Sequence, residues 1–222
     1  MTEASAADLA ALVAAVRRDL SAAPSRPARD AGTPVLYLVA ATSQLAEGWR
    51  DRVPRLEVAG NPSGPPALAD AVRRAAVACG VPLLWESPAD VIPLPRGWGE
   101  RVRAVSRDFG DARGPLAVLH FDPYSVVLRL VARGDEPDYV AALEYVRRGW
   151  VEPGRLERLL AEVLPRCTSE TLAQDPAEFR RKFRGLRQVA AMDAALRRPE
   201  DNPDKLDRIS RGLHTRPSIT DA

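Results

Sequence analysis

The fold of this chain is decided by residues 35–57, which read VLYLVAATSQLAEGWRDRVPRLE. Val35–Ala41 is aliphatic and β-branched enough for a buried strand, and Leu56–Val58 begins a second strand. Between them, Thr42–Gly48 is long enough for about two helical turns. The stretch therefore predicts a strand–helix–strand unit whose two strands pair in one sheet.

An amphipathic helix is predicted before this unit. Ser5 and Asp8 have the spacing of a capping box, which satisfies backbone donors at a helix start. Apolar residues then recur at helical spacing, at Leu9, Leu12, Val13, Val16 and Leu20. Ser21–Thr33, rich in Ala, Pro, Ser and Gly, is predicted to be a loop that leads to the first strand.

A second helix is predicted after the turn cluster Gly60–Pro66. It spans Ala67–Cys79 and ends at Gly80, because glycine is common just past a helix end. Val81–Glu86 follows as a strand or a buried loop. Pro82 lacks a backbone N–H, so a central position in a sheet is not expected for this segment.

The clearest remaining strand is Leu116–Phe121, which reads LAVLHF. The segment before it, Ser87–Gly99, is rich in proline and glycine, and we expect it to be irregular and anchored by Trp98. A mixed sheet built from this strand and the first two is the expected core of the N-terminal half.

The second half of the chain is predicted to be helical. Apolar periodicity and proline positions indicate helices over Tyr124–Ala132, from Glu136 or Pro137 to Arg148, from Pro153 and from Pro176. The expected fold class is α+β, with a small mixed sheet flanked by helices in residues 1–122 and a helical part in 123–198 packed on it. Residues 199–222 are polar and aperiodic, and we expect a flexible tail there.

With these elements in order, residues 35–57 resemble polymerase-β-type nucleotidyltransferases, specifically the bacterial family related to abortive-infection toxins. That family opens with a strand, a Gly-Gly pair, a helix, and then Gly and Arg before an Asp-x-Asp pair. Ala40 and Ala41 stand where the resemblance places the glycines, and Thr42 and Ser43 stand where small residues follow. The resemblance implies a degenerate phosphate-binding turn.

The resemblance places the metal-binding pair at residues 55 and 57. Gly48 and Arg52 match the later glycine and arginine, but Arg55 replaces the first Asp and Glu57 the second. Two carboxylates two residues apart on a strand share a face and can hold Mg²⁺ on nucleotide phosphates. An arginine cannot ligate Mg²⁺ and repels it, because its charge is permanent.

The resemblance extends into the helical half and covers roughly residues 33–196. The family's Asp-Pro, Lys-Leu, Arg-Gly and Lys-Asp pairs become Asp122-Pro123, Arg129-Leu130, Arg133-Gly134 and Pro137-Asp138. Arg148-Gly149 and Pro153 match a later Arg-Gly step and helix start. The site residues that the resemblance implies are Glu57 as a catalytic remnant and, for nucleotide binding, Thr42, Ser43, Arg52, Arg55, Arg129 and Asp138.

Composition sets broader bounds on the function. The formal net charge of 222 residues is only +2, which argues against a strongly electrostatic nucleic-acid binder. Cys79 and Cys167 lack metal-ligand spacing and form no disulfide framework. No apolar run approaches the length of a membrane span, so we expect a cytoplasmic protein without membrane contact.

Several candidate residues also have a purely structural interpretation. Glu57 lies near Arg50, Arg52 and Arg55 and would serve equally as a salt-bridge partner, and we expect Arg52 or Arg55 to pair with it or with another nearby carboxylate. His120 lies two residues before Asp122 and is expected to be a packed side chain rather than a ligand.

Three functions remain open from the sequence. The favoured one is a catalytically impaired nucleotidyltransferase-fold protein that binds a protein partner, a nucleotide or RNA in a toxin–antitoxin or phage-defence setting. The second is an active enzyme that modifies RNA or protein and requires Mg²⁺ held by Glu57 and another carboxylate such as Asp122. The third is a fold-only interaction protein. No cofactor is expected except Mg²⁺ under the second interpretation.

Overall fold

The protein, described here from a computed structural model, is built around a mixed five-stranded sheet. The structure describes residues 3–22, 33–61, 67–86, 92–106, 114–167 and 175–196. The strand order is β5-β4-β2-β7-β6. The strands span Val35–Leu38 (β2), Leu56–Gly60 (β4), Leu83–Glu86 (β5), Arg103–Ala104 (β6) and Ala117–His120 (β7).

The predicted strand–helix–strand unit is confirmed. Strand β2 pairs with β4 antiparallel, Leu38 opposite Val58, and with β7 parallel, Leu38 opposite His120. The predicted bounds were wrong, because β2 ends at Leu38 and helix α2 already begins at Ala40 and ends at Ala46. Most residues of α2 are buried, including Ala40 at its start. The apolar run of the strand therefore continues into the helix, and the sequence shows no change of period at the boundary.

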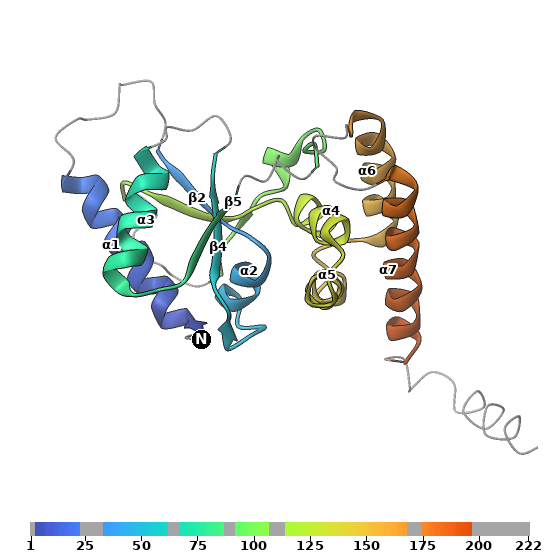
Figure 1. Ribbon diagram of the computed structural model, residues 1–222, viewed down its shortest axis with the longest axis horizontal. Helices are drawn as coiled ribbons and strands as arrows, with labels where there is room; N and C mark the ends of the chain where they lie inside the picture. The colour runs from blue at the N-terminus through green and yellow to red at the C-terminus, as the bar shows by residue number, and fades with distance from the viewer. Residues whose placement is uncertain are drawn as a thin grey trace, which may run out of the picture.

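One face of the sheet is covered by α1 (Ala6–Ala22) and α3 (Ala67–Cys79), as Figure 1 shows. Both helices were predicted. At the start of α1, Ser5 N and Ser5 Oγ donate to Asp8 Oδ2 at 2.7 and 2.6 Å, which confirms the predicted cap. Leucine and valine side chains of α1 and α3 pack on this face of β2 and β4 in one apolar core, which includes Leu12, Val72, Leu36, Leu38 and Val58.

Helices of the C-terminal half lie on the other side of the sheet, the first two nearest to it and the last two packed on the outer side of these, as Figure 1 shows in yellow to orange. They are α4 (Pro123–Arg133), α5 (Glu136–Arg147), α6 (Pro153–Val163) and α7 (Pro176–Leu196). A second apolar core lies between them and the sheet and contains Tyr37, Phe121, Leu128, Tyr145 and Phe179. The α+β fold class, with a mixed sheet followed by a helical half, is confirmed.

The sheet edges were only partly anticipated. Strand β5 pairs with β4 alone among the described strands, at the end of the sheet, which agrees with the exclusion of a central position by Pro82. Strand β6 was not predicted, nor was a separate two-stranded ribbon of β1 (Ala4–Ser5) and β3 (Arg52–Val53). Two-residue strands are too short to carry a period, so tertiary pairing alone defines them.

The segment before β6 contains a single 3₁₀ turn, Trp98–Arg101. Trp98 anchors it as predicted, because its ring stacks on Phe121 at 5.0 Å between centroids and meets the edge of Tyr37 at 6.0 Å. The predicted tail at 199–222 and most of the loops predicted over Ser21–Thr33 and Gly60–Pro66 lie outside the described residues. Within the described part, no helix combines the length and apolarity needed to cross a membrane.

Candidate functional site

Five charged side chains meet between the sheet and the C-terminal helices. Glu57 lies on β4 and Glu86 on β5, and the register that sets Ala59 opposite Glu86 puts both carboxylates on the same sheet face. Arg129 and Arg133 come from α4 and Asp138 from the first turn of α5. We call these five residues the charged cluster. Three of them, Glu57, Arg129 and Asp138, were site candidates from the sequence.

Arg133 is the centre of the charged cluster. Its Nη2 lies 2.7 Å and its Nε 3.0 Å from the two carboxylate oxygens of Asp138, and its Nη1 lies 3.3 Å from Glu86 Oε1. Arg129 Nη1 donates to the other oxygen of Glu86. Glu86 is therefore held by two guanidinium groups, one on each oxygen. Such charge-assisted, partly buried pairs fix geometry as well as charge.

Glu57 is the least well paired member of the cluster. The residue is 9% exposed, and its Oε2 is buried without a hydrogen-bond partner in the described part of the chain. It makes a loose ion pair with Arg55, whose Nε lies 3.8 Å from Glu57 Oε1. Burial, followed by the charge of Glu86, raises the pKa of Glu57 above its ordinary value despite Arg133 and Arg55. Within the charged cluster three carboxylates face two guanidinium groups, and Arg55 contacts Glu57 only loosely from outside the cluster.

We expect Glu57→Gln to raise the free energy of unfolding at pH 7–8 by about 1 kcal/mol, because it removes a buried, poorly paired charge. A carboxyl group whose pKa is higher in the folded than in the unfolded state lowers the free energy of unfolding most at pH values above its folded pKa. This loss of stability disappears at low pH, where the group is protonated in both the folded and the unfolded state. The advantage of the variant should therefore shrink as pH falls and disappear below about pH 4.5. Urea unfolding at several pH values measures it, and an advantage that grows in acid would contradict the assignment.

Arg55 and Arg52 lie at the edge of this site. The expected ion pair is confirmed as the loose Arg55–Glu57 contact, with 52% of the Arg55 side chain exposed. Arg52 is exposed on β3, opposite Ser5 of β1. Neither arginine enters the charged cluster. An exposed guanidinium at 3.8 Å contributes little to stability, because water screens it.

The hydroxyls of Thr42 and Ser43, on the first turn of α2, are turned inward. Thr42 Oγ1 accepts a hydrogen bond from Glu57 N at 2.6 Å, and Ser43 Oγ donates to Leu38 O at 2.9 Å. Both residues are buried. Their two hydrogen bonds connect α2 to the end of β2 and to β4. The helix thus fixes the backbone of Glu57 directly.

Ala40 opens α2 with a backbone φ of 44°, in the left-handed region that favours glycine. It is the sole non-glycine residue with positive φ in the described ranges. Its carbonyl accepts a hydrogen bond from Tyr145 Oη at 3.1 Å, which holds the turn from α5. Full burial strongly raises the pKa of Tyr145, so this hydroxyl stays protonated as a donor.

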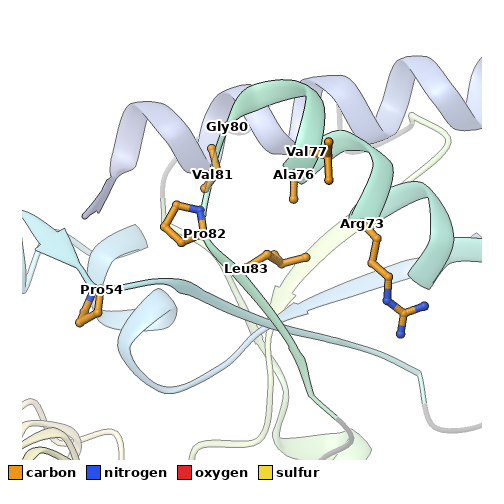
Figure 2. Close-up of a pocket in the computed structure, with 8 residues that line it drawn as sticks. All are labelled: Pro54, Arg73, Ala76, Val77, Gly80, Val81, Pro82 and Leu83. Atoms are coloured by element: carbon orange, nitrogen blue, oxygen red, sulfur yellow. The ribbon is translucent and has the colours of Figure 1, made fainter. Parts of the chain in front are cut away.

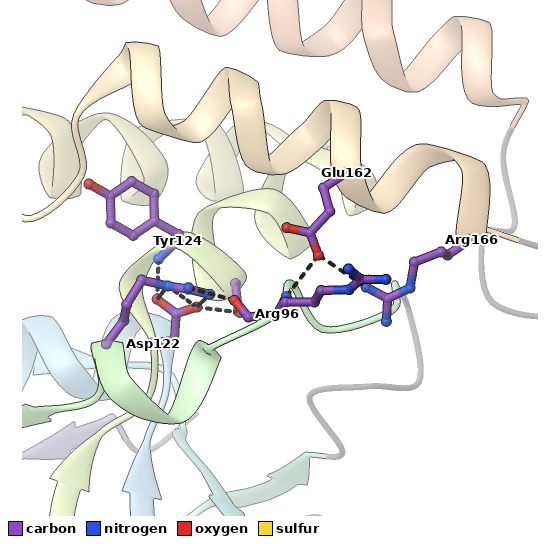
Figure 3. A network of polar contacts seen from close by, with 7 residues as sticks. Arg96, Asp122, Tyr124, Glu162 and Arg166 are labelled. Carbon is purple, nitrogen blue, oxygen red and sulfur yellow. Dashed lines mark hydrogen bonds and ion pairs between the residues drawn. The ribbon is translucent and has the colours of Figure 1, made fainter.

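A separate polar network surrounds Asp122, the N-cap of α4 (Figure 3). The carboxylate of Asp122 is fully buried and accepts from Arg101 Nη2 at 2.7 Å, from Arg101 Nε at 3.1 Å and from Ser125 Oγ at 2.7 Å. The stretch of chain just before the Trp98–Arg101 turn is fixed to α6, because Arg96 N donates to Glu162 Oε1 at 2.9 Å. Asp122 therefore joins the Trp98–Arg101 turn to the start of α4, while Arg96 joins the same stretch of chain to α6.

His120 is a packed side chain, as expected. It is fully buried, its Nε2 lies 2.8 Å from Glu47 Oε1, and its ring meets the edge of Trp150 at 4.8 Å between centroids. Burial lowers the pKa of His120 below its ordinary value, so the ring is neutral at physiological pH. Asp122, two residues further along the chain, accepts hydrogen bonds from Arg101 and Ser125 instead. His120 and Asp122 therefore do not form an acid–base pair.

Sequence reasoning missed Glu86, Arg101 and Glu47. Glu86 ends the apolar run LLWE, and a charged residue in a buried strand is itself a signal that a partner must exist. Arg101 and Glu47 carry no such signal, because Arg101 ends a 3₁₀ turn and Glu47 caps α2, and only the fold defines where these short elements end. Arg133 was matched to the Arg-Gly pair of the resemblance but not predicted as the centre of the cluster.

A hollow of about 690 Å³ lies at the β5 edge of the sheet, beside the end of α3 (Figure 2). It is lined by Pro54, Arg73, Ala76, Val77, Gly80, Val81, Pro82 and Leu83. Arg73 pairs with Asp70 at 3.2 Å on the helix surface. No residue of the charged cluster is among this lining, so the hollow is separate from the candidate site.

The described residues contain no group of three or more His, Cys, Asp or Glu side chains placed to hold a metal ion. No protein-family model matches the chain, and the comparisons with curated proteins and with solved structures give no match either.

Proposed function

We propose that this chain is a nucleotidyltransferase-fold protein that has lost metal-dependent transfer and acts by binding a protein partner in the cytoplasm. A toxin–antitoxin or phage-defence system is the setting that the resemblance suggests. An anionic ligand such as a nucleotide is the second candidate, because Arg55 is half exposed beside Glu57 and could attract a phosphate.

The contact between Arg55 and Glu57 carries this proposal. The resemblance places two metal-binding carboxylates at these positions, and here a guanidinium lies 3.8 Å from the one carboxylate that remains. Nucleotidyl transfer depends on metal ions that neutralise the phosphates. A permanent positive charge beside Glu57 opposes the binding of such an ion.

The surrounding contacts support the same conclusion. Glu86 and Asp138 are paired with Arg129 and Arg133, so arginines supply the positive charge near Glu57. Asp122, the carboxylate that an active enzyme would recruit, is engaged by Arg101. The left-handed backbone at Ala40 is what a glycine would adopt, which fits a turn that has kept its shape while losing its glycines.

The test is incubation of the pure protein with each labelled NTP, Mg²⁺, and RNA or protein acceptors. We expect no Mg²⁺-dependent transfer, and at most weak, salt-sensitive binding of nucleotides without metal. Calorimetry should show Mg²⁺ binding to the double variant Arg55→Asp/Glu57→Asp that the native chain lacks. Robust transfer by the native chain, abolished by Glu57→Ala, would establish the active enzyme instead.

A further inference from the structure

A groove of about 850 Å³ runs between α5 and α7, on the outer side of the helical half. Its walls include Tyr139, Val140 and Leu143 of α5 and Leu186 and Val189 of α7, with Gly185 between them. Figure 1 shows α7 lengthwise at the outer side of this half and α5 end-on, so the two contacting helices cross rather than run alongside each other. None of the five charged-cluster residues is in the lining, but the groove adjoins the cluster, because Lys182 Nζ donates to the backbone carbonyl of Arg133 at 3.3 Å.

Three of the four large apolar side chains that are exposed in the described ranges lie in or beside this groove. The large hydrophobic side chains exposed in the described ranges are Val77, Val140, Val189 and Met192. Val140 is 49% and Val189 47% exposed, and both line the groove. Met192 is 66% exposed and follows Val189 by three residues, so it extends the same side of α7. Single exposed apolar residues are ordinary, but contiguous ones mark interaction surfaces.

Gly185 is a second, independent feature of the groove. It lies inside α7, where glycine is a poor helix former. A Cβ built there meets no described atom within 4 Å, so packing within the described chain does not require a glycine. Its backbone φ is not in the left-handed region either. A glycine that lines an open groove instead allows the backbone of another helix to approach closely.

Charge indicates the kind of helix. Arg181 and Lys182 line the groove and lie 3.6 and 3.8 Å from Glu178 on the same helix, while Arg180 and Arg184 are exposed there. Glu136 is the one acidic residue in the described lining. A second copy of this chain would bring the same basic α7 against itself, and the like charges would oppose that contact. Acidic side chains beside an apolar stripe would be complementary.

We infer that the α5–α7 groove docks an acidic amphipathic helix of a partner protein. Its apolar stripe would cover Val140, Val189 and Met192, its backbone would cross α7 at Gly185, and its carboxylates would face Arg181, whose side chain is 72% exposed. This is the helix-in-groove mode of recognition. The inference rests on the proposed function only in that both assign a protein partner.

The experiment uses the full chain and a synthetic peptide of about 18 residues, long enough to be helical, with leucines at i, i+4, i+7 and i+11 and glutamates on the flanks. We expect fluorescence anisotropy to show saturable binding that weakens as salt is raised. Val189→Asp and Gly185→Leu should each weaken it about tenfold or more, the second without lowering the midpoint of thermal unfolding. Val77→Asp, which changes the exposed valine of the β5 hollow, is the matched control and should leave binding unchanged.

Several outcomes would overturn the inference. These are the absence of peptide binding, equal binding of a peptide with lysines in place of glutamates, or loss of binding in Val77→Asp alone. A dimer that Val189→Asp dissociates would assign the groove to a second copy. Tight binding of an RNA oligonucleotide that competes with the peptide would assign α7 to nucleic acid. Nucleotide transfer is measured separately from peptide binding. If the peptide does not bind and the native chain shows no transfer, only the groove inference fails. If the peptide binds and the native chain transfers nucleotide, only the proposed loss of transfer fails.

Discussion

Replacing Arg101 by methionine is expected to lower the free energy of unfolding by about 3–5 kcal/mol. Asp122 is fully buried, and Arg101, itself only 10% exposed, supplies its one ionic partner among the described residues. Removal of the guanidinium leaves a buried carboxylate with hydrogen bonds from Ser125 and Tyr124 N alone. The methionine preserves most of the apolar length of the side chain, so the loss reports on charge rather than on packing.

Urea unfolding measures this effect, and the exposed pair Arg74–Asp19 is the matched control. Its Nη2–Oδ2 distance is also 2.7 Å, but both side chains are more than a third exposed. Arg74→Met should cost less than about 1 kcal/mol. Adding Asp122→Asn to Arg101→Met should recover part of the loss, because the amide keeps the N-cap and removes the charge. Equal costs for Arg101→Met and Arg74→Met would contradict the assigned burial.

Replacing Arg133 by methionine is expected to cost about 2–4 kcal/mol at pH 7. The change removes both bonds to Asp138 and one to Glu86, and it leaves three carboxylates facing Arg129 alone within the charged cluster. The pKa of Glu57 is raised by burial and by Glu86 in the native protein, and loss of a cation raises it further. A carboxyl group with a raised pKa in the folded state destabilises the fold less as pH falls, because it becomes protonated there.

The cost of Arg133→Met should therefore shrink as pH falls from 7 toward 5. Thermal unfolding of native and variant chains across this range measures it. Arg187→Met is the control, because Arg187 pairs with Glu157 at 2.6 Å on the surface and half of each side chain is exposed. That variant should lose little stability and show no such pH trend. A penalty for Arg133→Met that is constant with pH would mean that the cluster carboxyls do not titrate in this range.

Prediction from the sequence succeeded where a local pattern is long or is marked by a terminating residue. The helix starts at Pro153 and Pro176 were predicted to the residue, because proline fits the first helical turn and no later one. Gly80 and Gly149, predicted as helix ends, both adopt positive φ in the structure. The three main strands were found because each is an apolar run that is buried or half-buried along its length.

Prediction was less successful where burial, rather than periodicity, sets the structure. The boundary between β2 and α2 was misplaced because Ala40 and Ala41 continue the apolar run into a buried helix. For the candidate site, the sequence singled out Glu57, Arg129 and Asp138 through an ordered resemblance. It did not find Glu86 as the carboxylate that holds Arg129 and Arg133 together.

The sequence by itself determined the order of the elements and the placement of Arg55 two residues before Glu57, because these are properties of neighbouring residues. Only the tertiary structure decided which charges meet. Glu57 and Glu86 become neighbours through the parallel pairing of β4 with β5, and Arg129 and Arg133 reach them because α4 packs on that sheet face. Long-range pairing leaves no trace in local periodicity, and the pairing of buried charges is fixed only when the sheet and the helices exclude water together.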